Sequence, residues 1–294
     1  MKDNDLRILA AKHGLQIQGE LTFNEIGLDF RIVFAETLDG RRWVLRIPRR
    51  PDIFPQIEHE ARILNLVKRR LRISVPDWKV VSPELIAYPL LTDKPAISSD
   101  PVTHEMTWNI ESESKEFIVS LAQTLADLHA TPISEAEKFG LKVLTPLEAR
   151  KELSEEIDLV KSNLGMNANH ERQLRDWVSN DSLWPEFSVL AHGDLYAGHI
   201  LTERNGRITG IIDWSEAEVT DPSLDFAGHL AVFGEESLKA LINEYDKAGG
   251  RTWSTMLDQI KERHSASFLK FAVFALNSGN DEYIAAAKTA LQGP

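Results

Sequence analysis

The sequence predicts an α+β protein of two lobes, a small β-rich lobe over residues 1–91 and a larger, mainly helical lobe over residues 92–294. Three observations favour this class. Short apolar, β-branched runs joined by turn dipeptides gather in the first 91 residues. Apolar residues at helical spacing dominate the remainder. The length of 294 residues suits two domains, since one domain usually takes about 100–200 residues.

The composition is that of an ordinary globular chain, with 43% hydrophobic and 27% charged residues. The net charge of −12 argues against a nucleic-acid-coating protein and suits a cationic small molecule, although many proteins are this acidic for solubility alone. The lack of cysteine excludes disulfides, thiolate zinc sites and cysteine nucleophiles. No apolar run approaches a bilayer span, and the first residues lack the apolar core of a secretion signal. We therefore expect a cytoplasmic protein without a membrane partner.

The N-terminal lobe begins with a predicted helix that Asp3 or Asn4 caps and that Gly14 ends. Asp39-Gly40 is a strong hairpin signal between two β-branched runs. Apolar residues at helical spacing then predict a helix before the last two strands. The expected elements are a helix to His13, a strand over 15–23, a turn over 24–29, strands over 30–37 and 43–47, a helix over 55–70, and strands over 78–81 and 85–91.

The C-terminal lobe is predicted from helical stripes and helix caps. One stripe consists of Phe117, Leu121, Leu125 and Leu128. The run from Thr145 to Glu148 combines a capping box with proline at the first helical position. Asn205-Gly206 is a second hairpin signal. The other expected elements are a helix over 170–179, strands over 189–191, 199–202 and 208–212, and three or four closing helices, one of which ends at Gly249-Gly250.

The densest chemical signal is the run AHGDLYAGHIL over 191–201, followed by GIIDW over 210–214. Asp194 and His199 lie on a loop between strands, and Asp213 ends the next hairpin strand. Because a hairpin brings its two ends together, His199 and Asp213 are expected to approach each other. One aspartate can orient an attacking hydroxyl and accept its proton, while the other two residues can hold Mg²⁺ on a nucleotide phosphate. The competing interpretation, that both aspartates only cap turns, suits either residue alone better than the set.

These residues resemble the kinase-like fold of the aminoglycoside phosphotransferase superfamily. His192-Gly193-Asp194, with the residue five places on, is similar to its catalytic loop H-G-D-x-x-x-x-N, and Ile212-Asp213-Trp214 is similar to its metal-binding segment. Within the superfamily the chain resembles the macrolide 2′-phosphotransferases, from about residue 20 to the C-terminus. The similar stretches are NEIGLDF (24–30), WVLRIPRR (43–50), HGDLYAGH (192–199), IDWSEA (212–217) and FGEE (233–236).

The resemblance implies a two-lobed protein-kinase-like fold and transfer of the γ-phosphate of GTP, with ATP as the alternative donor, to the 2′-hydroxyl of a macrolide. That reaction inactivates the antibiotic. Asp194 would position and deprotonate the hydroxyl, while His199 and Asp213 would hold Mg²⁺. The residues implied to contact the nucleotide are Arg46, paired with Glu60, then Asn24 and Gly27 of the phosphate loop, and the backbone of Ile86, Ala87 and Tyr88. His192 and Asp225 would support the loop.

Three positions depart from the superfamily pattern. Position 199 is His where most members have Asn, and Mg²⁺ usually prefers oxygen ligands. The phosphate-loop candidate has a single glycine, Gly27, so it must either hold phosphate with fewer backbone amides or receive help from a side chain such as Asn24. Arg46 replaces the lysine of protein kinases, a tolerable change because a guanidinium grips phosphate oxygens with two bonds.

The acceptor pocket is the least determined part of the site. A macrolide is large, apolar and carries a tertiary ammonium, so its pocket needs apolar walls and one or two carboxylates. The candidates are the aromatic residues Tyr196 and Phe233 and the carboxylates Glu216, Glu218, Glu235 and Glu236. The sequence does not select among them.

Other interpretations stay open. Arg46 and Glu60 can be surface charges rather than a phosphate-binding pair. The same fold can act on an aminoglycoside or a choline-like metabolite, or can bind nucleotide without catalysis. A metal-dependent hydrolase built on His192, Asp194 and His199 would need a further metal ligand close by and would release phosphate without an acceptor.

Overall fold

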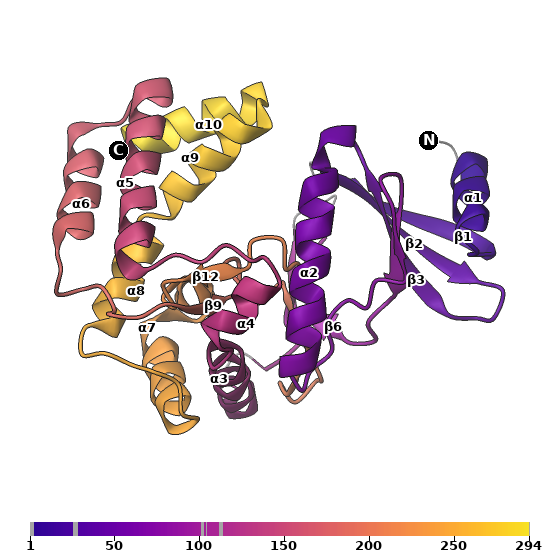
Figure 1. The fold of residues 1–294 in the computed structure, drawn as a ribbon, viewed down its shortest axis with the longest axis horizontal. Coiled ribbons are helices and arrows are strands. Elements are labelled where there is room, and N and C mark those ends of the chain that lie inside the picture. The colour runs from indigo at the N-terminus through magenta and orange to yellow at the C-terminus, as the bar shows by residue number, and fades with distance from the viewer. Residues whose placement is uncertain (1–2, 26–28, 101–102, 104, 112–113, 294) are drawn as a thin grey trace. The chain divides into compact units, whose positions relative to one another are not determined.

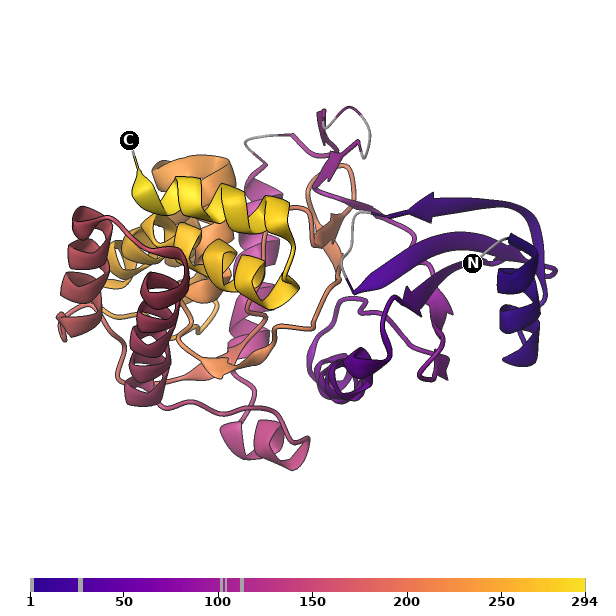
Figure 2. The same ribbon diagram turned by 90° about the horizontal axis from the view of Figure 1, so that it is seen from above.

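The computed structural model describes residues 3–293 except 26–28, 101–102, 104 and 112–113 (Figures 1 and 2). The chain divides into two compact units, an N-terminal unit of residues 1–114 with 198–215 and a C-terminal unit of residues 115–197 with 216–294. The first contains an antiparallel sheet and the second is mostly helical, which confirms the predicted α+β class. No helix in the described part of the chain is long and apolar enough to cross a bilayer.

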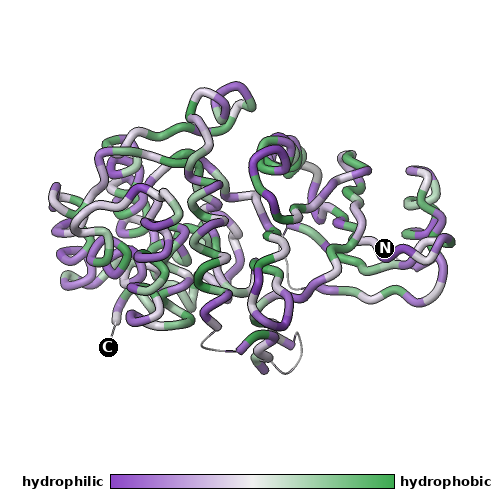
Figure 3. Tube along the Cα trace, turned by 90° about the horizontal axis from the view of Figure 1, so that it is seen from below, coloured by the Kyte–Doolittle hydropathy of each residue, from purple (hydrophilic) through white to green (hydrophobic). Residues whose placement is uncertain are grey.

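The C-terminal unit consists of amphipathic helices and a two-stranded sheet. Apolar and polar residues interleave along these helices (Figure 3), so each has a face to bury. Thr145 forms the predicted capping box with Glu148. The helices are α3 (Lys115–His129), α4 (Ile133–Lys138), α5 (Pro146–Leu164), α6 (Ala168–Ser179), α7 (Leu224–Lys247), α8 (Met256–Ser265), α9 (Ser267–Ser278) and α10 (Asp281–Gln292), and β9 (Val189–Ala191) pairs with β12 (Glu218–Thr220). Helices α5, α6, α9 and α10 share one apolar core.

The sheet of the N-terminal unit has the strand order β1-β2-β3-β5-β4. Its strands are β1 (Ile17–Asn24), β2 (Phe30–Thr37), β3 (Arg42–Pro48), β4 (Val80–Val81) and β5 (Ile86–Pro89). Asp39-Gly40 forms the predicted turn between β2 and β3, with Gly40 at φ 79° and the Thr37 hydroxyl donating to Asp39 at 2.6 Å. Strand β4 is shorter than the predicted run over 78–81.

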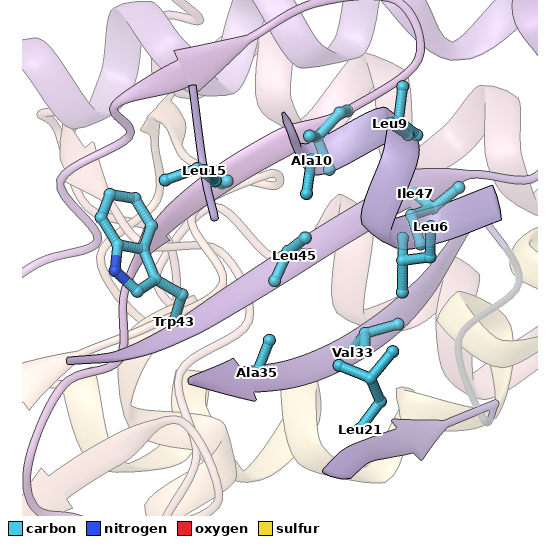
Figure 4. Packing of buried hydrophobic residues seen from close by; sticks show 12 residues of the cluster. Leu6, Leu9, Ala10, Leu15, Leu21, Val33, Ala35, Trp43, Leu45 and Ile47 are labelled. Atoms are coloured by element: carbon cyan, nitrogen blue, oxygen red, sulfur yellow. The ribbon is translucent and has the colours of Figure 1, made fainter. Parts of the chain in front are cut away.

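Helices cover the two faces of this sheet. Helix α1 (Asp3–Lys12) buries Leu6 and Leu9 in a core that includes Trp43 and Leu45 (Figure 4). Helix α2 (Phe54–Arg70) packs Ile57 against β5 in a second core. Because successive side chains along a strand point to opposite faces, Leu45 faces the first core and Arg46 the other side of the sheet.

A second hairpin joins the N-terminal unit from far along the chain. Strands β10 (Ile200–Thr202) and β11 (Ile208–Ile211) pair around the predicted Asn205-Gly206 turn, and β10 also pairs with β6 (Lys94–Pro95). The backbone N–H and the carbonyl oxygen of Ser74 both form hydrogen bonds with the backbone of β11. A Cβ on Gly210 would lie 2.9 Å from the Ser74 carbonyl oxygen. These contacts group residues 198–215 with the N-terminal unit, while the predicted lobe boundary at residue 92 stays a prediction.

Several short elements were not predicted from the sequence. They are η1 (Pro51–Ile53), β6, β7 (Ile97–Ser99), β8 (Met106–Trp108), α4 and β12. Most have two or three residues, too few to establish a hydrophobic period, so their pairing depends on partners distant in sequence.

Candidate active site

Arg46 and Glu60 form a buried ion pair in the N-terminal unit. Arg46 Nη1 lies 2.8 Å from Glu60 Oε1, and the two side chains are 12% and 3% exposed. Arg46 also lies over the rings of Phe30 and Trp78, at 4.1 and 5.3 Å from their centroids. Burial alone would lower the pKa of Arg46, but the Glu60 carboxylate raises it, so the guanidinium stays charged. The surface-charge interpretation of both residues is therefore wrong.

The other predicted nucleotide contacts fall on β1, β5 and the segment between β1 and β2. Asn24 is the last residue of β1, and Gly27 lies outside the described residues. Strands β3 and β4 both pair with Ile86 and Ala87, whereas Tyr88 pairs with Val44 of β3. Since two neighbours already engage the backbone of Ile86 and Ala87, the chain from Tyr88 onwards is the more accessible part of this segment.

The two ends of the β10–β11 hairpin bring His199 and Asp213 together, as the hairpin argument predicts. His199 Nε2 lies 3.6 Å from Asp213 Oδ2, and the Ile212 amide donates to the His199 carbonyl oxygen at 3.0 Å. Asp213 has φ 63°, in the left-handed region that favours glycine, and it accepts a bond from Ser215 Oγ at 3.1 Å. Such a conformation costs energy, so the surrounding hairpin must impose it.

His199 and Asp213 fit a metal that arrives with a nucleotide better than a metal held by protein alone. Among the described residues, no group of three or more His, Cys, Asp and Glu side chains is placed to hold an ion. Mg²⁺ is commonly bound through one or two carboxylates together with substrate phosphates. The Asp213 carboxylate, at 47% exposure, is a carboxylate of that kind, and the neighbouring imidazole of His199 would be an additional nitrogen ligand.

A buried carboxylate organises the loop over residues 192–197, here called the 192–197 loop, in the C-terminal unit. Asp225 is 1% exposed and accepts the backbone N–H groups of His192 and Gly193, both at 2.9 Å. His129 Nε2 lies 3.1 Å from the same carboxylate. Burial alone would raise the pKa of Asp225, but the His129 bond and the backbone bonds outweigh it and lower the pKa. Asp225 therefore remains an anion that fixes the backbone just before Asp194.

Two glycines let neighbouring segments press against the 192–197 loop. Gly193 has φ 83°, and a Cβ there would lie 2.3 Å from the Glu216 carbonyl oxygen. Gly228 lies inside α7, where a Cβ would come within 2.2 Å of the Leu195 carbonyl oxygen. The loop thus packs backbone to backbone against α7. Glycine within a helical pattern was the available sequence signal for Gly228.

Asp194 follows this fixed backbone and is contacted by Lys270 of α9. Lys270 Nζ lies 3.2 Å from Asp194 Oδ1 and donates to the Gly193 carbonyl oxygen at 3.0 Å. Both side chains are about half exposed. His192, in contrast, is fully buried, and its Nδ1 accepts the Asp194 N–H at 3.3 Å. That burial counts against the hydrolase interpretation, which needs His192 as a metal ligand.

The predicted acceptor residues separate into two groups. Tyr196 is 42% exposed on the 192–197 loop, and Glu216 is exposed where it abuts Gly193. Phe233 instead packs against His229 at 4.6 Å and Phe117 at 5.2 Å between ring centroids.

The carboxylates at the kink of α7 already have cationic partners. Gly234 breaks the helical geometry with φ 78°. Beyond it, Glu235 pairs with Lys239 and Lys261, both at 3.0 Å, and Glu236 pairs with Lys239 at 2.7 Å. Glu218 pairs with Lys142 at 3.1 Å, a further engaged carboxylate. Each of the three carboxylates, Glu218, Glu235 and Glu236, therefore already has a lysine partner.

These features are typical of a kinase-like protein with a phosphotransferase site, and the family comparison agrees. Residues 20–258 match the Phosphotransferase enzyme family, and the chain belongs to that family. The uncharacterised protein YcbJ of Bacillus subtilis (strain 168) is 39% identical over 286 residues, which cover 96% of this chain and 94% of that protein.

Two solved structures are similar over nearly the whole chain. Macrolide 2′-phosphotransferase type I has a TM-score of 0.95 and 47% identity, covering 99% of this chain and 97% of that one. Macrolide 2′-phosphotransferase MphH from Brachybacterium faecium has a TM-score of 0.90 and 35% identity, covering 99% and 98%. The resemblance inferred from the sequence motifs is thereby confirmed.

Proposed function

We propose that this protein transfers the γ-phosphate of GTP to the 2′-hydroxyl of a macrolide antibiotic and so confers resistance. The observation that carries the proposal is the 47% identity, at a TM-score of 0.95, with a macrolide 2′-phosphotransferase over 99% of this chain. The choice of GTP over ATP rests on the motif resemblance alone. A cytoplasmic location stays a prediction.

Asp194 is the proposed base. Its carboxylate accepts a hydrogen bond from the acceptor hydroxyl and orients that oxygen towards the γ-phosphorus. As the new O–P bond forms, the bond from the γ-phosphorus to the β–γ bridging oxygen breaks, the hydroxyl proton passes to Asp194, and GDP leaves. The loop geometry supports this role, since Asp225 and Gly193 fix the backbone that carries Asp194.

Arg46, His199 and Asp213 serve the donor in this proposal. The charged Arg46 guanidinium, held by Glu60 and two aromatic rings, provides a fixed cation for the nucleotide phosphates. Mg²⁺ bound to Asp213 and His199 would neutralise negative charge on those phosphates.

An aromatic surface favours an apolar acceptor over a polycationic one. Phe271 and Phe274 of α9 and Tyr283 of α10 form a ring cluster with centroids 5.6 to 6.5 Å apart. Phe274 is 43% exposed and lies one helical turn after Lys270, the residue that contacts Asp194. An aminoglycoside, which carries several ammonium groups, would require several carboxylates instead of an aromatic surface.

The test is phosphate transfer by the purified protein, with Mg²⁺ and labelled GTP, to erythromycin, kanamycin or choline. We expect one phosphoryl group on erythromycin, faster transfer than to kanamycin, and better use of GTP than of ATP at equal low concentration. Phosphate release without an acceptor would indicate a hydrolase. Nucleotide binding without transfer to any acceptor would indicate a non-catalytic protein. Growth of a susceptible bacterium on erythromycin tests the resistance role.

A further inference from the structure

We propose that Lys270 is a positioning residue that sets the orientation of the Asp194 carboxylate. This inference rests on the proposed function of Asp194 as the base. Lys270 lies on α9, 76 residues beyond Asp194, and its Nζ contacts both Asp194 Oδ1 at 3.2 Å and the Gly193 carbonyl oxygen at 3.0 Å. One ammonium therefore links the carboxylate to the backbone that precedes it.

The Gly193 carbonyl oxygen is a firm anchor for the lysine. Gly193 has φ 83°, its N–H is bonded to buried Asp225, and it has no space for a Cβ. The Asp194 N–H, in the same peptide unit as this carbonyl, donates to His192 Nδ1 at 3.3 Å, so the peptide units on both sides of the Gly193 Cα are held. A lysine ammonium carries three donors, so one N–H can hold the anchor while another holds the carboxylate.

Asp194 needs such a restraint because its side chain is 46% exposed. An exposed carboxylate ordinarily samples several rotamers, and only some of them direct an oxygen to the acceptor hydroxyl. Holding Oδ1 fixes the carboxylate plane, and with it the direction of the second oxygen. Positioning of this kind acts on the transfer step rather than on nucleotide binding.

The same pair contributes little to fold stability. Both partners are about half exposed, and ion pairs between exposed groups are weakened by water and salt. Loss of Lys270 should therefore change turnover while the thermal unfolding midpoint stays nearly constant. A purely structural lysine would show the opposite pattern.

The first experiment compares Lys270→Met, Lys270→Arg and the control Lys288→Met, which removes the same charge from an exposed position of α10. For Lys270→Met we expect kcat on the order of tenfold lower, with KM for GTP and directly measured GTP affinity unchanged. Lys270→Arg should recover part of that loss, and Lys288→Met should match the wild type. An unchanged or raised kcat in Lys270→Met would overturn the proposal, because the lysine would then be idle or would compete with the acceptor.

A double-mutant cycle tests whether the lysine acts through Asp194. In an Asp194→Asn background, Lys270→Met should cause little further loss, since the carboxylate it orients is absent. Losses that multiply would mean that Lys270 acts independently of Asp194.

Crystal structures separate failure of this inference from failure of the proposed function. Asp194 should adopt one rotamer in the wild type and a different or mixed rotamer in Lys270→Met. The same single rotamer in both would exclude positioning by Lys270, whatever the acceptor is. Absence of transfer by the wild type would reject the proposed function but would leave this rotamer comparison decisive.

Discussion

His129 Nε2 lies 3.1 Å from Asp225 Oδ2, and the two side chains are almost completely buried. The other ring nitrogen of His129 lies 2.8 Å from the Tyr245 hydroxyl. His129 is the last residue of α3, and Asp225 and Tyr245 lie near opposite ends of α7, so this imidazole ties the end of α3 to both ends of α7, including the carboxylate that holds the 192–197 loop.

The His129–Asp225 bond should contribute more to stability than the His129–Tyr245 bond. His129→Leu removes both bonds, and because it leaves a buried carboxylate short of a donor it should lower the free energy of unfolding by about 2–4 kcal/mol. Tyr245→Phe removes only a neutral hydroxyl bond and should cost about 1 kcal/mol. Urea denaturation of both variants measures the difference. Equal losses would show that the carboxylate bond is not the dominant one.

Asp194→Asn should lower kcat by on the order of 10²-fold or more, because the amide cannot accept the hydroxyl proton. GTP affinity should change little, since the residue acts on the acceptor. Turnover with a saturating acceptor and direct GTP binding measure the two effects. Near-normal turnover would remove Asp194 from the mechanism.

Asp213→Asn should abolish transfer and weaken Mg²⁺-dependent GTP binding together. Asparagine tolerates the left-handed backbone observed at φ 63°, so this variant removes charge without adding backbone strain. GTP titrations with and without Mg²⁺ provide the measurement. Full Mg²⁺-dependent affinity in the variant would mean that the metal is held elsewhere.

Gly228→Ala should destabilise the protein although alanine favours helices. The new Cβ would approach the Leu195 carbonyl oxygen to 2.2 Å, and we expect a loss of about 1–3 kcal/mol with lower activity. Ala240→Gly, at an exposed position of the same helix, measures the intrinsic helix preference, about 1 kcal/mol. A more stable Gly228→Ala variant would contradict the close packing of the loop on α7.

His229 should make the fold sensitive to acid. Burial lowers the pKa of His229 to about 4, from an ordinary value of 6.5. Above pH 6.5 both folded and unfolded forms are neutral, so the shift has no effect. Below pH 6.5 the imidazole becomes protonated in the unfolded chain but not in the native protein. The free energy of unfolding therefore falls as the pH drops towards 4.

Between pH 7 and pH 5 this one residue should cost about 2 kcal/mol of unfolding free energy. His229→Gln cannot titrate, so its urea denaturation should lose that much less stability over the same interval. Other groups titrate in both proteins and cancel in the comparison. Parallel losses in the two proteins would show that His229 is not the source.

Signals confined to a few neighbouring residues were readable from the sequence. The Asp39-Gly40 and Asn205-Gly206 turns and the Thr145 cap depend on adjacent residues, and the structure contains all three. The approach of His199 to Asp213 followed from the second turn. Motif resemblance identified Asp225, whose bonds the structure supplies.

The contacts of Lys270 and His129 could not be predicted from the sequence, because they join residues 76 and 96 positions apart. A lysine on an amphipathic helix is ordinarily a solvated charge, and nothing nearby in sequence marks this one. The sequence shows a glycine inside a predicted helix at position 228, which indicates a close contact there. It does not show which carbonyl oxygen leaves no space for a side chain.

The bonds from His192 and Gly193 to buried Asp225 determine when the 192–197 loop becomes ordered. A loop held by such bonds loses its conformational entropy as the chain folds and not as substrates bind. The free energy of substrate association is then available for aligning the reacting groups instead of ordering the backbone. On the role that we propose for Asp194, the protein would therefore meet its substrates with this loop already ordered.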